Sequence, residues 1–226
     1  MGAGIFYMKL KVCGMRDVEN IKALSELKPD FMGFIFYDKS PRFVGNSLGS
    51  VPSGGVPMDT EVMNSLPREI KKVGVFVNAT TDYIVQNVKK YGLHYVQLHG
   101  NEMPDFCRNL KFKGINIIKA FSIDNTFIFS QLNNYKPHVD FFLFDAKGDG
   151  YGGNGVSFDW NILKKYDNEK PYFLAGGVSL ENIDDLGNII PKPYAVDVNS
   201  KFELSPAIKD IEKLEELLDT IRPVEA

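Results

Sequence analysis

Residues 73–99 read VGVFVNATTDYIVQNVKKYGLHYVQLH, a stretch typical of a strand, a helix and a second strand. Val73–Val77 and Tyr95–His99 are short and mostly apolar, as expected for strands buried on both faces of a parallel sheet. Thr80 or Thr81 is suited to begin the helix, because a threonine side chain can accept a hydrogen bond from an amide of the first turn. The stretch therefore predicts a βαβ unit.

The same alternation continues along the whole chain. Six further strands are predicted at Lys9–Cys13, Phe31–Phe36, Asn116–Ala120, Phe141–Asp145, Tyr172–Ala175 and Ala195–Val198. A helical segment is predicted after each strand, and the clearest is Pro206–Ile221, where apolar residues recur at helical spacing. Eight such units in 226 residues favour a single α/β domain with the (β/α)8 TIM-barrel fold over an open doubly wound sheet.

Other segments complete this predicted organisation. Asp124 and Ser179 are expected to begin helices, and a short helix is expected at about Asp59–Leu66. Residues 1–8 are interpreted as an N-terminal extension of the domain. Gly45–Pro57 is rich in glycine, serine and proline, which predicts a long mobile loop on the catalytic face.

Composition favours a cytoplasmic protein with a small-molecule ligand. The net charge of −3 provides no basic surface for nucleic acid or for an anionic membrane. No apolar run approaches the roughly 20 residues of a membrane span. The two cysteines, Cys13 and Cys107, form no CxxC pair, so neither a zinc cluster nor a disulfide framework is predicted.

A TIM barrel places its active site at the carboxyl ends of its strands. The polar residues predicted there are Cys13, Arg42, Asn78, His99, Asp145, Gly176, Gly177, Asn199 and Ser200. Structural interpretations stay open for several of them, because a cysteine is often a small buried hydrophobe, an aspartate can cap a helix and a histidine can bond loop backbone. Cys13 is distinguished by the following Gly14, which allows a sharp turn over the barrel mouth.

Alternation along the first strand predicts a buried ion pair. Lys11 and Cys13 share one strand face, whereas Leu10 and Val12 share the other face and suit the helix-packed outside. Lys11 would then point into the barrel, where its ammonium needs an anion. Asp197 on the eighth strand is the expected partner, because the eighth strand neighbours the first in a closed barrel.

Glycines after the later strands indicate a phosphate site. Gly176-Gly177 follows the seventh strand and Asn199-Ser200 the eighth, where TIM barrels bind phosphate on backbone amides. Gly152–Gly155, after the sixth strand, is interpreted either as a flexible flap or as a plain surface turn.

Several motifs resemble the phosphoribosylanthranilate isomerase family in order and spacing, from Lys9 onward. They are Lys11–Gly14, Gly33–Tyr37, Lys39–Arg42, Val73–Asn78, Val96–Gly100, Ile118–Ala120, Gly152-Gly153, Phe158–Trp160, Ala175–Gly177 and Val196–Val198. The resemblance implies a cofactor-free Amadori rearrangement of N-(5'-phosphoribosyl)anthranilate to the 1-deoxyribulose 5-phosphate aminoketose in tryptophan biosynthesis. It also implies a phosphorylated aminosugar as ligand, no metal, and a monomer or a homodimer.

The same resemblance implies roles for individual residues. Cys13 is expected to be the general base, Asp145 the general acid, and Arg42 the contact for the anthranilate carboxylate. The other expected substrate contacts are His99, Gly153, Gly176, Gly177, Asp197, Asn199 and Ser200. A carboxylic acid kept neutral in an apolar mouth can protonate the furanose oxygen, and a thiolate can remove the C2 proton.

The chain departs from the family pattern at three places. The Gly45–Pro57 loop is longer than usual, Asn154 replaces a threonine or serine in the Gly152–Gly155 flap, and Asn199-Ser200-Lys201 replaces Ser-Ser-Gly. Lys201 is expected to be either solvated or in reach of the phosphate edge, with the backbone amides intact.

Rival interpretations come from other barrels. The histidine-pathway aminosugar isomerase carries an aspartate at the position of Cys13, and a non-catalytic phosphate-binding barrel would not need both Cys13 and Asp145. Ribulose-phosphate epimerase needs paired histidine and aspartate metal ligands, whereas the histidines here are only His94, His99 and His138.

Overall fold

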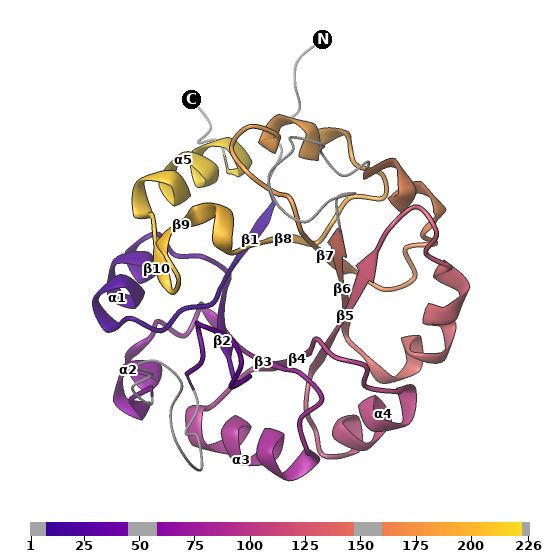
Figure 1. The fold of residues 1–226 in the computed structure, drawn as a ribbon, viewed down its shortest axis with the longest axis horizontal. Coiled ribbons are helices and arrows are strands. Elements are labelled where there is room, and N and C mark those ends of the chain that lie inside the picture. The colour runs from indigo at the N-terminus through magenta and orange to yellow at the C-terminus, as the bar shows by residue number, and fades with distance from the viewer. Residues whose placement is uncertain (1–7, 45–57, 147–159, 223–226) are drawn as a thin grey trace.

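The computed structural model describes residues 8–44, 58–146 and 160–222, in which eight parallel strands form a closed barrel (Figure 1). The strands are β1 (Lys9–Cys13), β2 (Phe31–Ile35), β3 (Lys71–Phe76), β4 (Tyr95–Leu98), β5 (Ile117–Ile123), β6 (Phe141–Ala146), β7 (Tyr172–Ala175) and β8 (Ala195–Val198). They pair in chain order, and β8 closes the barrel against β1. The predicted (β/α)8 barrel is confirmed.

The described α-helices lie around the outside of the barrel (Figure 1). They are α1 (Val18–Glu26), α2 (Thr60–Ser65), α3 (Thr81–Tyr91), α4 (Pro104–Phe112) and α5 (Ile211–Ile221). Thr80 is the residue that caps α3, because its side chain accepts a hydrogen bond from the amide of Tyr83. Gly92 ends α3 in the left-handed conformation that glycine adopts readily.

The helical segments after β5, β6 and β7 are short 3₁₀ helices in the part of the chain that the structure describes. They are η1 (Phe129–Asn134), η2 (Lys136–His138), η3 (Trp160–Lys165) and η4 (Ile183–Asn188). The predicted helix starts at Asp124 and Ser179 are wrong. The Asp124 carboxylate accepts the Thr126 amide in a local turn, whereas the Ser179 amide donates to the Asn182 side chain, and η4 begins only at Ile183.

The predicted helix Pro206–Ile221 is also wrong at its start. After η5 (Ser200–Phe202), strands β9 (Glu203–Ser205) and β10 (Ile208–Lys209) form an antiparallel hairpin. Ala207 has a φ of 73° in the turn, and α5 begins only at Ile211, where Asp210 accepts the amide of Lys213. Because Ile208 continues the apolar spacing of α5, the helical pattern hides this hairpin.

Apolar side chains fill both sides of the barrel wall. Phe31 and Phe173 meet edge to face inside the barrel with ring centroids 5.0 Å apart. Leu10 and Val12 belong instead to the larger core between the strands and the outer helices, as their alternation predicts. None of the helices described is long and apolar enough to cross a membrane.

Some predictions lie outside the described residues. They concern positions 1–7 of the N-terminal extension, the Gly45–Pro57 loop, and the Gly152–Gly155 segment that contains Gly153. Met8, the last residue of the predicted extension, is buried, and its amide donates to the carbonyl of Ile221 at the end of α5.

Candidate active site

A cavity of about 260 Å³ lies at the carboxyl ends of the strands. Eight of the ten predicted site residues line it: Cys13, His99, Asp145, Gly176, Gly177, Asp197, Asn199 and Ser200. Arg42 is not among the lining residues, although its side chain packs over Gly14, next to Cys13. Gly153 lies outside the described residues.

Two glycines make room for the side chains around Cys13. A Cβ atom at Gly33 would lie 2.8 Å from the Cys13 Sγ atom, and one at Gly14 would lie 2.5 Å from Cδ of Arg42. Gly14 also has a φ of +83°, which turns the chain immediately after β1. Burial raises the pKa of the Cys13 thiol, an effect opposed by the nearby ammonium groups of Lys11 and Lys209.

Lys11 and Asp197 form the ion pair that alternation predicts. They are register partners on β1 and β8, and Nζ of Lys11 lies 2.8 Å from Oδ2 of Asp197. The Lys11 side chain is fully buried and that of Asp197 is 8% exposed. Burial lowers the pKa of Lys11, but Asp197 and Cys13 together outweigh this effect, and the pKa is raised. Burial also raises the pKa of Asp197, an effect that Lys11 opposes. Lys11 therefore carries its charge inside the barrel.

His99 faces Asp145 across the mouth of the barrel. Nε2 of His99 lies 3.4 Å from Oδ2 of Asp145, and both side chains are about one third exposed. The side-chain amide nitrogen of Gln97 lies 2.9 Å from Nδ1 of His99. The tautomer of His99 decides which of these two groups donates the hydrogen bond. His99 thus contacts a predicted catalytic group, and Gln97 is a site residue that the sequence reasoning did not single out.

The loops after β7 and β8 form another wall of the cavity. Gly176 and Gly177 both have a φ of +75°, a backbone conformation that other residues adopt at a cost. Ser200 and Lys201 are exposed at the start of η5 and line the same cavity. The side chain of Asn199 is partly committed elsewhere, because its Oδ1 accepts a hydrogen bond from Nζ of Lys209 at 2.7 Å.

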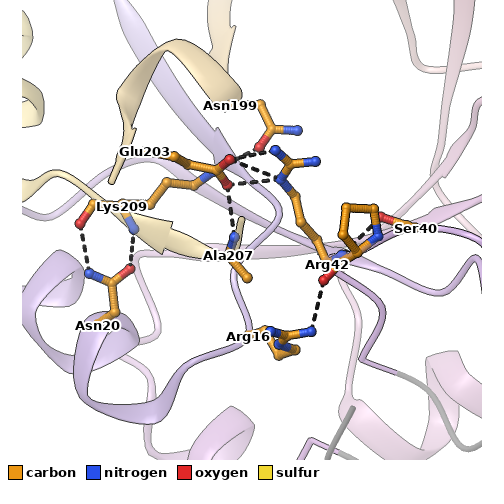
Figure 2. A network of polar contacts seen from close by, with 9 residues as sticks. Arg16, Asn20, Ser40, Arg42, Asn199, Glu203, Ala207 and Lys209 are labelled. Carbon is orange, nitrogen blue, oxygen red and sulfur yellow. Dashed lines mark hydrogen bonds and ion pairs between the residues drawn. The ribbon is translucent and has the colours of Figure 1, made fainter. Parts of the chain in front are cut away.

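Arg42 is bound by a carboxylate that the sequence reasoning missed. Nε of Arg42 lies 2.8 Å from Oε1 of Glu203, and Nη2 lies 2.5 Å from Oε2 (Figure 2). Lys209 approaches the same carboxylate at 2.6 Å. Glu203 and Lys209 were missed because Lys209 was assigned to a helix. The later helix start could have been predicted from Asp210, a good N-cap residue placed directly before Ile211. A helix that begins at Ile211 leaves the preceding residues available for a hairpin.

A second buried charge pair supports the loop after β4. Nζ of Lys119 lies 3.1 Å from Oε2 of Glu102, and both side chains are almost fully buried. Glu102 also accepts the amides of Asn78 and Gly100. This pair therefore holds the backbone beside His99. The sequence indicates this ion pair by placing Lys119 within an otherwise apolar strand, as it does for Lys11.

Among the described residues, no three histidine, cysteine, aspartate or glutamate side chains gather as a metal ion would require. The cavity instead combines a thiol, a carboxylate and a histidine with glycine-rich loops and a nearby guanidinium. These groups can transfer protons and can hold an anionic ligand. Fold and site together define a TIM-barrel enzyme with acid-base groups at the carboxyl ends of its strands.

The chain belongs to the N-(5'-phosphoribosyl)anthranilate (PRA) isomerase family, whose model matches residues 10–220. The N-(5'-phosphoribosyl)anthranilate isomerase of Parabacteroides distasonis is 41% identical over 215 residues, covering 95% of this chain and 93% of that protein. The corresponding protein of Phocaeicola vulgatus is 39% identical over 204 residues, with 90% and 92% covered. The chain is accordingly an isomerase of tryptophan biosynthesis that converts PRA to 1-(o-carboxyphenylamino)-1-deoxyribulose 5-phosphate.

Solved structures agree with this family. Phosphoribosyl anthranilate isomerase from Thermotoga maritima superposes with a TM-score of 0.80 at 30% identity, covering 96% of this chain and all of that one. Another phosphoribosyl anthranilate isomerase structure, with a TM-score of 0.78 at 27% identity, is a complex with reduced 1-(o-carboxyphenylamino)-1-deoxyribulose 5-phosphate, and the same shares are covered. The family decides against both the histidine-pathway isomerase and the non-catalytic barrel.

Proposed function

We propose that Asp145 is the general acid and Cys13 the general base of the PRA isomerisation. Asp145 donates a proton to the furanose oxygen as the C1–O bond breaks, and the nitrogen lone pair forms the C1–N iminium. Cys13 then removes the proton from C2, which gives an enolamine. Protonation at C1 and loss of the O2 proton complete the aminoketose, so C2 is oxidised, C1 is reduced and no cofactor is needed.

The environment of Cys13 supports this order of steps. Because burial raises the pKa of its thiol, the thiol form is favoured while the cavity is empty. The iminium formed by ring opening brings a positive charge beside Cys13, and a nearby cation favours the thiolate. Ring opening by Asp145 therefore prepares Cys13 to act as a base.

Two regions are proposed to hold the anionic ends of the substrate. The backbone amides around Gly177 and Ser200 would bind the phosphate, with Lys201 at the edge of this site. Arg42 would bind the anthranilate carboxylate, for which a guanidinium fork is well suited. His99 and Asp197 line the same cavity and would contact the sugar. A relative that is 27% identical was solved in complex with the reduced product, which supports a ligand of this kind.

Location and assembly are proposed on separate grounds. Cys13 and Cys107 are both free thiols, which fits a reducing cytoplasm. A Thermotoga maritima relative, 27% identical, is described as a dimeric enzyme from which monomers were generated, so the chain is proposed to be a monomer or a homodimer. Sedimentation of the purified chain would decide between the two.

The observation that carries the catalytic roles is that Cys13 and Asp145 line one cavity together with Gly176 and Gly177. The test follows the loss of fluorescence of PRA generated in situ, with the parent and with a Cys13→Ala/Asp145→Asn double variant. We expect turnover by the parent only. Turnover by the double variant at the parental rate would refute both assignments.

A further inference from the structure

Glu203 occupies only one of the two hydrogen-bonding edges of the Arg42 guanidinium. Its carboxylate takes Nε and Nη2, which form the side edge of the group. The end edge consists of Nη1 and the second N–H of Nη2. Nη1 has no hydrogen bond to any residue that the structure describes. The end edge is thus free for a second carboxylate, which it can bind through two parallel bonds.

The Glu203 carboxylate is itself held firmly in place. Besides Arg42 it binds Nζ of Lys209 at 2.6 Å and the amide of Ala207 at 3.1 Å (Figure 2). Asn20 on α1 exchanges two hydrogen bonds with the backbone of Lys209. The β9–β10 hairpin is therefore anchored to α1, and Glu203 is fixed relative to Arg42 in the loop after β2.

Charge counting identifies what this network lacks. The bonded side chains of Arg42, Glu203 and Lys209 carry two positive charges and one negative charge, and they are 16%, 4% and 0% exposed. Burial lowers the pKa of Lys209, and Glu203 and Cys13 oppose this effect. With Lys209 protonated and the Cys13 thiol neutral, the cluster is short of one anion, because buried charges need partners. If Glu203 were paired with Arg42 alone, it would cancel the charge that attracts an acidic ligand. Lys209 prevents this cancellation.

We propose that Glu203, supported by Lys209, is a positioning residue that orients the end edge of Arg42 toward the anthranilate carboxylate of the substrate. Cδ and Nε of Arg42 lie close to Gly14, so the side chain passes beside the residue that follows Cys13. The substrate carboxylate completes the charge balance of the cluster. Specificity for an acidic aromatic amine therefore depends on the hairpin after β8 as well as on Arg42. This inference rests on the proposed role of Arg42.

The test compares Glu203→Gln with a matched control at the opposite end of the barrel. Asp30 also binds one arginine, Arg222, and one backbone amide, that of Leu10 at the start of β1. Asp30→Asn therefore removes a similar carboxylate without touching the cavity. Thermal unfolding of both variants measures the structural cost, while KM for PRA, kcat, and inhibition by free anthranilate and by inorganic phosphate measure the effect on the site.

We expect Glu203→Gln to raise KM and to weaken inhibition by anthranilate by about tenfold, because a misdirected guanidinium loses its aligned bonds. Inhibition by phosphate and kcat should change much less, and Asp30→Asn should change none of these kinetic values. In an Arg42→Ala background, Glu203→Gln should have no further effect on inhibition by anthranilate. An equal loss of anthranilate and phosphate inhibition would overturn the proposal, as would an effect that persists without Arg42.

The Arg42→Ala variant separates two kinds of failure. If Arg42→Ala leaves inhibition by anthranilate unchanged, the role of Arg42 is wrong, and the role of Glu203 falls with it. If Arg42→Ala weakens inhibition but Glu203→Gln behaves like Asp30→Asn, only the proposal for Glu203 is overturned. The isomerase activity of the parent is tested by its own turnover.

Discussion

Lys11 on β1 and Asp197 on β8 join the first and last strands of the barrel through a buried ion pair of 2.8 Å. Lys11→Met should lower the free energy of unfolding by about 3–5 kcal/mol, because the Asp197 carboxylate would be left without its buried partner. Urea unfolding measures the change. Lys22→Met, which breaks the exposed pair with Glu19, is the control and should cost less than about 1 kcal/mol. Similar losses in both variants would contradict a special role for the buried pair.

Cys13→Ala should lower kcat by about 10²–10⁴-fold, since it deletes the proposed base and removes little volume. Binding of a reduced product analogue should persist, and the circular dichroism spectrum should not change. Cys107→Ala is the matched control, because Cys107 is buried in α4 and belongs to the outer core. A kcat for Cys13→Ala within roughly threefold of the parent would remove Cys13 from the mechanism.

Asp145→Asn should also act on kcat, because the amide keeps the shape of the carboxyl group but cannot protonate the ring oxygen. Steady-state kinetics of PRA turnover provide the measurement. Asp105→Asn, on the exposed face of α4, serves as the control for the same chemical change. If Asp145→Asn raised KM without lowering kcat, Asp145 would be a binding residue and another acid would have to be sought.

The pH dependence should report the titration of Cys13. A general base acts in its deprotonated form, and burial raises the pKa of this thiol above its ordinary value. The value of kcat/KM in the free enzyme should therefore increase as the pH rises from neutral toward the thiol pKa. Cys13→Asp should lose this alkaline increase in whatever activity it retains, since a carboxyl group titrates at a much lower pH. An alkaline dependence that is the same in Cys13→Asp as in the parent would contradict the assignment, because both proteins need the same protonated acid.

Lys201→Gly should change KM by less than about tenfold and kcat very little, because an exposed ammonium at the rim contributes at most about 1 kcal/mol. The exposure of Lys201 beside Ser200 supports this expectation. Inorganic phosphate should compete with PRA in both proteins. A much larger rise in KM, or loss of the competition, would show that Lys201 is a primary phosphate ligand.

Strand alternation was sufficient to predict the buried ion pair between β1 and β8. Lys11 and Asp197 each lie between apolar neighbours that face outward, so both side chains were predicted to point into the barrel. They were predicted to meet because β8 pairs with β1 when the barrel closes. The strand ends likewise predicted seven residues that line the cavity, since parallel strands deliver their carboxyl ends to one rim. Arg42 and Asn78 were predicted in the same way but are not among the lining residues. These predictions depend on periodicity and chain order, which are properties of the sequence itself.

The hairpin network could not be predicted in the same way. Ile208 fits both the helical spacing of α5 and a short strand, so periodicity alone did not separate them. The contact between Glu203 and Arg42 depends on how two loops fold over the barrel rim, and no repeating pattern encodes such geometry. The 3₁₀ helices after β5 to β7 were hidden for a related reason, because short helical turns share the residue spacing of longer helices.

The pairing of β1 with β8 also determines when the enzyme can first become active during its synthesis. Lys11 and Arg42 leave the ribosome long before Asp197 and Glu203, from which they are separated by 186 and 161 positions. The ammonium of Lys11 must stay hydrated until β8 is made, because no earlier strand supplies its carboxylate. Closure of the barrel and completion of the Arg42 site can therefore follow only after β8 and the hairpin after it have been synthesised, and a stalled nascent chain that lacks β8 would be inactive.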